Sequence, residues 1–126
     1  MPAVEQVETL IIGGGQAGLT MSHRLSERGR PHLVLERHRI AERWRTERWD
    51  SLRLQGPNWS VRLPDFPFPH PDPDGFATAG EIVEFIAAYA DFITAPVRCG
   101  VEVSSLRQRD GDQGFRAETS SVAIEA

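Results

Sequence analysis

The feature that most constrains the fold of this 126-residue chain is a glycine-rich hexad at residues 13–18, which stands between two different hydrophobic patterns. Before it, residues 7–12 form a short β-rich run, which predicts a buried strand. After it, apolar residues recur every fourth position, which predicts an amphipathic helix over residues 16–28, ended by Gly29. A second strand is expected at residues 33–35. The spacing therefore predicts a βαβ unit with parallel strands.

The hexad Gly-Gly-Gly-Gln-Ala-Gly satisfies the spacing G-x-G-x-x-G, and each glycine in that spacing has a physical role. Gly13 permits a sharp turn after the strand, Gly15 allows a pyrophosphate to approach the backbone, and Gly18 allows the helix to lie close to the sheet. The amide groups at Gly15, Gln16 and Ala17 are expected to face the anion, with the positive end of the helix dipole behind them. Hexads of this kind also occur in ordinary loops, but the flanking strand and helix favour a dinucleotide site here.

Glu36 is the expected acidic partner of the hexad. It follows Gly18 by seventeen residues and ends the second predicted strand, where a carboxylate can accept both hydroxyl protons of an adenosine ribose. Its charge disfavours a ribose 2′-phosphate. The residues alone therefore favour FAD or NAD over NADP at this site.

The middle of the chain is less regular. Residues 40–54 mix charged and apolar residues, which predicts a short helix or turn followed by an extended piece at 52–54. Six of the nine prolines lie between residues 57 and 73, where they disfavour helix and sheet interiors and predict a long loop. Four aromatic residues in and after it indicate that this loop packs onto the protein, although a free polyproline ligand is an alternative. These are Trp59, Phe66, Phe68 and Phe76.

The clearest predicted helix follows this loop. Thr78 and Glu81 have the spacing of a capping box, and apolar residues continue at helical intervals over residues 79–93. Alternating valines then predict one strand over residues 97–103. A turn at 110–112 is expected to lead back into a strand at 115–119, with a third strand starting at 122–124, so the end of the chain is predicted to be a small β-meander.

Charge and composition narrow the classes of partner. The formal net charge of −4 argues against nucleic acid and acidic membranes, and the absence of a long apolar run or a leader suggests a cytoplasmic protein. All fourteen cations are arginine, and residues 24–62 contain ten of them against five acids, which is either a solvated surface or an anion site. The single cysteine, Cys99, and the spacing of the four histidines predict no metal site.

Residues 9–18 and 33–37 resemble the FAD-binding N-terminus of flavin-dependent oxidoreductases. Three further segments, at residues 44–45, 49–54 and 63–69, are similar in order and spacing to segments of the flavin-containing monooxygenases and their bacterial relatives. The resemblance implies an α/β fold: a Rossmann-like βαβ FAD-binding fold with a long proline-rich loop, a further helix and a small β-meander. It covers essentially residues 1–126, which we expect to form a single but incomplete FAD-binding domain.

Carried over by position, the resemblance implies a set of cofactor-binding residues. The pyrophosphate would be held by Gly13, Gly15, Gln16, Ala17 and Gly18. Glu36 and Arg37 would frame the ribose, and Val103 would touch the adenine. Trp44 and Arg45 would line the flavin, and Gln55 is the candidate catalytic residue beside it. The family usually has glycine just before the Trp-Arg pair, whereas this chain has Ala41, Glu42 and Arg43.

The function implied is that of an FAD-dependent oxidoreductase of the NAD(P)H-dependent monooxygenase type, acting on an unknown small molecule. NADPH is implied by the family, but no second glycine fingerprint for it occurs in this chain, nor does the strand that normally completes the FAD domain. We therefore expect a chain truncated before the NADPH-binding fold, with a complementary polypeptide carrying the missing half as one expectation. The alternative is a non-catalytic dinucleotide-binding fragment or subunit that binds FAD or NAD without turnover. Catalysis by this chain alone stays open.

Overall fold

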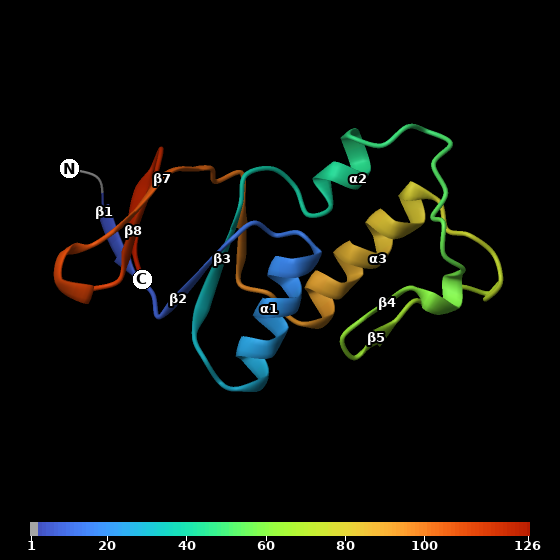
Figure 1. Cartoon of the computed structure of the whole chain (residues 1–126), viewed down its shortest axis with the longest axis horizontal. Coiled ribbons are helices and arrows are strands. Elements are labelled where there is room, and N and C mark those ends of the chain that lie inside the picture. Colours follow the sequence, from blue (N-terminus) through green and yellow to red (C-terminus); the bar gives the residue numbers. More distant parts are fainter. Residues whose placement is uncertain (1–2) are drawn as a thin grey trace.

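The structure is a computed structural model that describes residues 3–126 (Figure 1). The strands are β1 (Ala3–Gln6), β2 (Thr9–Ile12), β3 (His32–Glu36), β4 (Arg62–Leu63), β5 (Phe66–Pro67), β6 (Val97–Cys99), β7 (Val103–Gln108), β8 (Phe115–Thr119) and β9 (Val122–Glu125). The α-helices are α1 (Gln16–Glu27), α2 (Glu42–Thr46) and α3 (Ala79–Phe92), and single 3-10 turns occur at Asn58–Ser60 and Asp110–Asp112.

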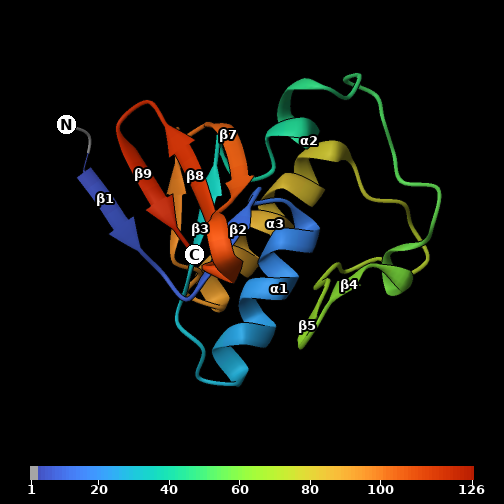
Figure 2. The same ribbon diagram turned by 60° about the vertical axis from the view of Figure 1, so that its left-hand side comes forward.

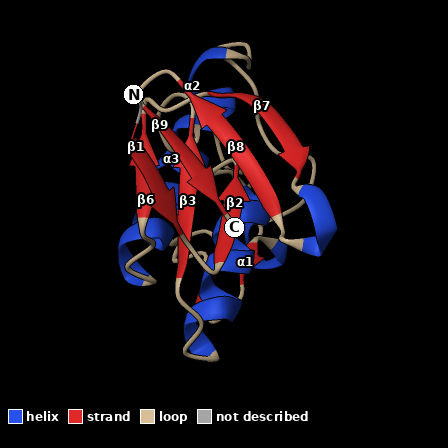
Figure 3. Cartoon of the chain, turned by 90° about the vertical axis from the view of Figure 1, so that its left-hand side faces the viewer, coloured by secondary structure: helices blue, strands red, loops and turns tan. Residues whose placement is uncertain are grey.

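These elements form three layers. The central layer is a parallel sheet with strand order β2-β3-β6, and the second sheet has the order β1-β9-β8-β7. Figure 3 shows the four-stranded sheet in front of the parallel sheet, with the helices on the far side. The predicted α/β fold, its parallel βαβ unit and its β-meander are therefore confirmed.

Each face of the parallel sheet has its own apolar cluster. Leu33 and Leu35 of β3 are buried against Ile124 of β9, between the two sheets. A larger cluster lies on the helical side, where Leu19 of α1 is fully buried with residues of α3. Side chains alternate between the faces of a strand, so β3 can contribute to a core on both sides, as a buried parallel strand does.

Helix α3 begins with the predicted capping box. Glu81 N donates to Thr78 Oγ1 at 3.1 Å, and Thr78 N donates to Glu81 Oε1 at 3.1 Å. The buried face of α3 consists of residues at helical intervals: Ile82, Phe85, Ile86, Tyr89 and Ala90. The spacing of this pattern fixes which face of the helix is covered.

The proline-rich loop packs onto the protein, as predicted, and the element that it contacts is α3. The ring of Phe66 lies 5.4 Å from that of Phe85, and the ring of Phe68 lies 5.0 Å from it. Figure 2 shows this loop on the helical side of the molecule, away from both sheets. Trp59 is 69% exposed, so it does not contribute to that packing. The loop also contains one ladder that was not predicted, the two-residue pair β4–β5, with Pro67 in an edge strand that needs no amide donor.

Two predictions about strands were wrong in extent. The strand expected over residues 97–103 is two strands, since β6 pairs with β3 and β7 pairs with β8. The chain changes sheets at Gly100, whose φ of 75° is open to glycine and strained for other residues. Similarly, the first strand starts at Thr9, and residues 3–6 form the unpredicted β1, which pairs in parallel with β9. Among residues 3–126, no helix has the length and apolar content needed to cross a bilayer.

Candidate functional site

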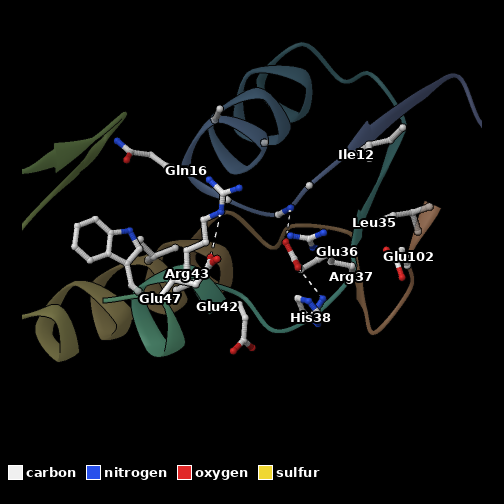
Figure 4. Close-up of a pocket in the computed structure, with 18 of the residues that line it drawn as sticks. Ile12, Gln16, Leu35, Glu36, Arg37, His38, Glu42, Arg43, Glu47 and Glu102 are labelled. Carbon is white, nitrogen blue, oxygen red and sulfur yellow. Dashed lines mark hydrogen bonds and ion pairs between the residues drawn. The ribbon is translucent and has the colours of Figure 1, made fainter. Parts of the chain in front are cut away.

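A cavity of about 720 Å³ lies where the carboxyl ends of β2 and β3 meet the start of α1. Helix α2 and the segment 101–103 close its other sides (Figure 4). Open α/β sheets bind ligands at this end of their strands, and the volume lies within the range of small-molecule sites. The residues lining it include most of those predicted from the sequence: Gly13, Gly15, Gln16, Ala17, Gly18, Glu36, Arg37, Trp44 and Val103.

Three glycines of the turn between β2 and α1 differ in whether the protein would allow a side chain at their position. Gly13 has a φ of 109°, which a residue with a side chain rarely adopts. A Cβ at Gly18 would lie 1.9 Å from the carbonyl oxygen of Gly13, so the helix can lie this close to the strand only with glycine there. A Cβ at Gly15 would have no atom within 4 Å. Gly13 has the same open space, but its φ disfavours a side chain, so of these three positions only Gly15, which lines the cavity, has both the space and the backbone conformation for one.

The N-terminus of α1 is open toward this space. Gly15 is its N-cap, no side chain caps the helix, and no acidic residue occurs in the first turn. Gln16 and Ala17, which follow, are exposed. The first amides of an α-helix have no partner within the helix, and they carry the positive end of the dipole. These amides are therefore available to an anion in the cavity.

Glu36 closes the opposite wall at the end of β3. Its Oε1 accepts a hydrogen bond from Gly14 N at 3.0 Å, and its Oε2 accepts one from His38 N at 2.7 Å (Figure 4). Each carboxylate oxygen has two acceptor positions, so each can still accept a further hydroxyl proton. The two backbone bonds hold the carboxylate in a fixed place at the rim of the cavity.

Helix α2 presents one of its two predicted residues to the cavity. Trp44 lines it, and the guanidinium of Arg48 lies 4.8 Å from the centre of the Trp44 ring, an arrangement that suits a cation–π contact. Arg45 is not among the lining residues, and its Nε donates to Ile40 O at 3.0 Å. Gln55 is exposed and is not among them either. The roles proposed for Arg45 and Gln55 at a flavin stay predictions.

Several lining residues were not predicted from the sequence to be site residues: His38, Glu42, Arg43, Glu47, Arg48 and Glu102. The spacing of Arg43 and Glu47 could have predicted that they pair, because residues four apart in a helix share a face. Arg43 Nε lies 3.4 Å from Glu47 Oε2. The hydrogen bonds from Arg39 hold the pKa of Glu42 at about 2, down from 4.5, so this carboxylate stays charged at neutral pH.

A second group of polar side chains lies outside the cavity. His23 Nε2 is 2.8 Å from Asp65 Oδ2 and 3.9 Å from Glu27 Oε1, a grouping that spacing could not predict because Asp65 is 42 residues away. Arg24 Nη1 lies 2.7 Å from Glu27 Oε1 and 4.0 Å from Asp65 Oδ2. Arg24 already supplies positive charge to the carboxylates of Glu27 and Asp65, so we interpret the cluster as an ion-pair network.

Comparison with known proteins points to a flavin cofactor. Residues 6–48 match the family model of an FAD binding domain, and this segment contains the turn, Glu36 and α2. The chain is 35% identical over 105 residues to an uncharacterized CzcO-like oxidoreductase of Geobacillus kaustophilus, an alignment covering 82% of this chain and 30% of that protein. It is 36% identical over 107 residues to a probable indole-3-pyruvate monooxygenase, YUCCA1, of Arabidopsis thaliana, covering 84% of this chain and 25% of the relative.

The fold agrees with these relatives. A flavin monooxygenase from Stenotrophomonas maltophilia, solved as a double mutant, superposes with a TM-score of 0.85 at 24% identity, over 97% of this chain and 36% of the other. The chain thus spans between a quarter and about a third of the length of these proteins. In sequence and in fold, the chain is similar to the FAD-binding portion of flavin-containing monooxygenases.

Proposed function

We propose that this chain binds FAD in the cavity between α1, β3 and α2, with the ADP half of the cofactor against the glycine turn. One observation carries the proposal: the open space above Gly15 and the fixed carboxylate of Glu36 line the same cavity. A pyrophosphate needs backbone amides that it can approach closely, and an adenosine ribose needs a paired acceptor. The cavity offers both, so its residues fit the cofactor.

The proposed contacts follow the walls of the cavity. The pyrophosphate is held by the amides of the turn, formed by Gly13, Gly15, Gln16, Ala17 and Gly18. Glu36 accepts the ribose hydroxyls, with Arg37 beside it, and Val103 lies against the adenine. Trp44 faces the flavin from α2. The negative charge of Glu36 disfavours a 2′-phosphate at this position, which supports FAD or NAD over NADPH in this site.

We further propose that residues 1–126 form one partial FAD-binding domain of a monooxygenase that uses NADPH on a small molecule in the cytoplasm. FAD held by these residues would supply redox chemistry between a reduced nicotinamide and oxygen. The residues of this chain bind and orient the cofactor and exclude water around it. The alignments cover only 30% and 25% of these relatives, which supports a role for further polypeptide, in the same chain or a complementary one, in NADPH and substrate binding.

The experiment is a titration of the purified chain with FAD, followed by flavin fluorescence and the visible spectrum. The matched variant is Gly15→Val, because Gly15 lines the cavity and a Cβ there would have no protein atom within 4 Å. We expect saturable binding by the wild-type chain and a loss of affinity of about 100-fold in the variant, with unchanged circular dichroism. Wild-type protein that binds no FAD, or a variant that binds it equally well, would refute the proposal.

The same sample tests turnover. Adding NADPH to the loaded chain and following loss of the flavin absorbance shows whether these residues support reduction. We expect little bleaching, since the proposed NADPH site lies outside this chain. Full loss of the flavin absorbance with this chain alone would contradict the proposal that the NADPH site lies outside it. FAD binding without loss of absorbance fits both a cofactor-binding part of an enzyme and a non-catalytic binding module. Adding the remaining polypeptide of the complete protein then separates these two, because only the enzyme regains turnover.

A further inference from the structure

Three arginines line the cavity, Arg37, Arg43 and Arg48, and their surroundings differ. Arg48 lies over the ring of Trp44. The Arg43 side chain is 75% exposed, and its ion pair with Glu47 uses Nε, which lies 3.4 Å from Glu47 Oε2. Figure 4 shows this side chain leaving α2 and reaching into the cavity on the side of α1, with its guanidinium end foremost. The terminal nitrogens of Arg43 are therefore presented to a ligand.

Helix geometry explains why Arg43 faces the cavity and Arg45 does not. Successive residues of an α-helix are about 100° apart, so positions 43 and 45 point roughly 200° apart, to opposite sides of α2. Glu47, four positions after Arg43, returns to the same side and pairs with it. Arg45 instead donates to Ile40 O and braces the start of the helix. The resemblance to the family implies Arg45 at the flavin, whereas the arginine of α2 that lines the cavity beside Trp44 is Arg43, two residues earlier.

We infer that Arg43 binds the diphosphate of the cofactor through its guanidinium, opposite the amides of the glycine turn, and that Glu47 holds Arg43 in place. This inference rests on the proposed FAD site. The turn supplies only backbone donors to one side of a doubly charged group, and a guanidinium fork can pair with the oxygens on the other side. Glu47 positions the arginine through Nε but adds a negative charge near the anion, so it opposes binding while it orders the side chain.

The test uses three ligands that share adenosine: FAD, ADP and adenosine itself. Removing the guanidinium in Arg43→Gln should weaken FAD and ADP about tenfold and leave adenosine unchanged, because adenosine has no diphosphate. Arg43→Lys, which keeps the charge and loses the fork, should recover part of the affinity. Arg28→Gln is the matched control, because Arg28 is an exposed arginine outside the cavity lining, and we expect it to change the affinity for none of the three ligands.

Glu47→Gln tests the second half of the inference. Its amide oxygen can still accept from Arg43 Nε while the negative charge is removed, so ADP should bind two- to threefold more tightly in this variant. The gain should be smaller when Arg43→Gln is present as well, because the substitution then relieves only the direct repulsion between Glu47 and the anion, and no longer the competition of this carboxylate for the charge of Arg43.

The outcomes separate this inference from the proposed function. If wild-type protein binds neither FAD nor ADP, the cofactor site itself is wrong. If it binds both and Arg43→Gln binds ADP with the wild-type affinity, only the role of Arg43 is wrong. Equal losses for ADP and adenosine would also overturn the inference, since they would mean that the substitution deforms the site. Circular dichroism and the melting temperature of each variant check that the fold is retained.

Discussion

The two long helices of this chain begin with nearly the same backbone conformation, but side chains cap the first amides of α3 and not those of α1. The N-cap of α1, Gly15, has φ and ψ of −84° and −168°, and the N-cap of α3, Thr78, has −78° and 163°. At α3, Thr78 and Glu81 satisfy each other's backbone amides. At α1, no side chain does so.

The difference separates stability from binding. Side chains that cap a helix contribute to the folded state at all times. Amides left open contribute only when a ligand occupies them, and the ligand then stabilises the fold by mass action. The start of α3 is therefore built to hold the proline-rich loop and the core together, and the start of α1 is kept free for an anion.

The largest effect is expected at the glycine that fixes α1 against β2. A methyl group at Gly18 would lie 1.9 Å from Gly13 O, a backbone atom that cannot move without displacing the turn. Overpacking of this kind costs about 1–3 kcal/mol and more where nothing can yield, against a total stability of about 5–15 kcal/mol. Gly18→Ala should therefore lower the melting temperature steeply and abolish FAD binding. Gly80→Ala in α3, where the nearest atom is 3.9 Å away, is the matched control and should be tolerated.

Converting the start of α1 into a capped one should separate the two properties. Gly15 already has the backbone conformation of an N-cap, and its Cβ position is open. Gly15→Asp should leave the free energy of unfolding unchanged or raise it by a few tenths of a kcal/mol, because the carboxylate caps the amides. The same carboxylate occupies the place of the diphosphate and repels it, so FAD affinity should fall about 100-fold. Calorimetry and FAD titration on one sample measure both quantities, and a parallel loss of stability and binding would contradict the comparison.

Both helix starts could be predicted from the sequence because their signals are local. The hexad and the pair Thr78 and Glu81 each define a backbone geometry within six residues. Glu36 was predictable as well, because a βαβ unit of ordinary length brings the end of β3 beside the turn. The aromatic residues of the proline-rich loop pointed to packing, and Phe66 and Phe68 do lie on α3.

What could not be predicted depends on contacts distant in sequence. The valines at 97, 101 and 103 alternate as one strand would, and only the pairing of β6 with β3 and of β7 with β8 divides them between two sheets. The partner of β1 lies more than a hundred residues away, in β9. The choice between Arg43 and Arg45 required the rotation of α2 about its own axis, which a five-residue helix with mixed charges does not reveal.

A smaller effect is expected from removing the cap of α3. Thr78→Ala deletes the acceptor of Glu81 N, and the loss of such a cap costs about 1 kcal/mol. FAD affinity should change less than twofold, because the cavity lining does not include Thr78. Denaturant unfolding and FAD titration measure the two quantities. A loss of FAD affinity as large as that in Gly15→Asp would mean that the two helix starts are energetically coupled.

The smallest effect is the pH dependence of the same cap. The bond from Thr78 N lowers the pKa of Glu81 below its ordinary value of 4.5, and His70, whose Nε2 lies 2.5 Å from Glu81 Oε2, lowers it further. A carboxylate with a lowered pKa in the folded state contributes its full stability above pH 4.5 and loses it as the pH falls through the folded value. Melting temperatures between pH 6 and pH 3 should therefore fall less in Glu81→Gln than in the wild type. Parallel curves would show that the carboxylate contributes nothing to stability through its charge. The backbone amides at Gly15 and Gln16 have no such titration, so this carboxylate adds a pH dependence to the start of α3 that the amides at the start of α1 lack.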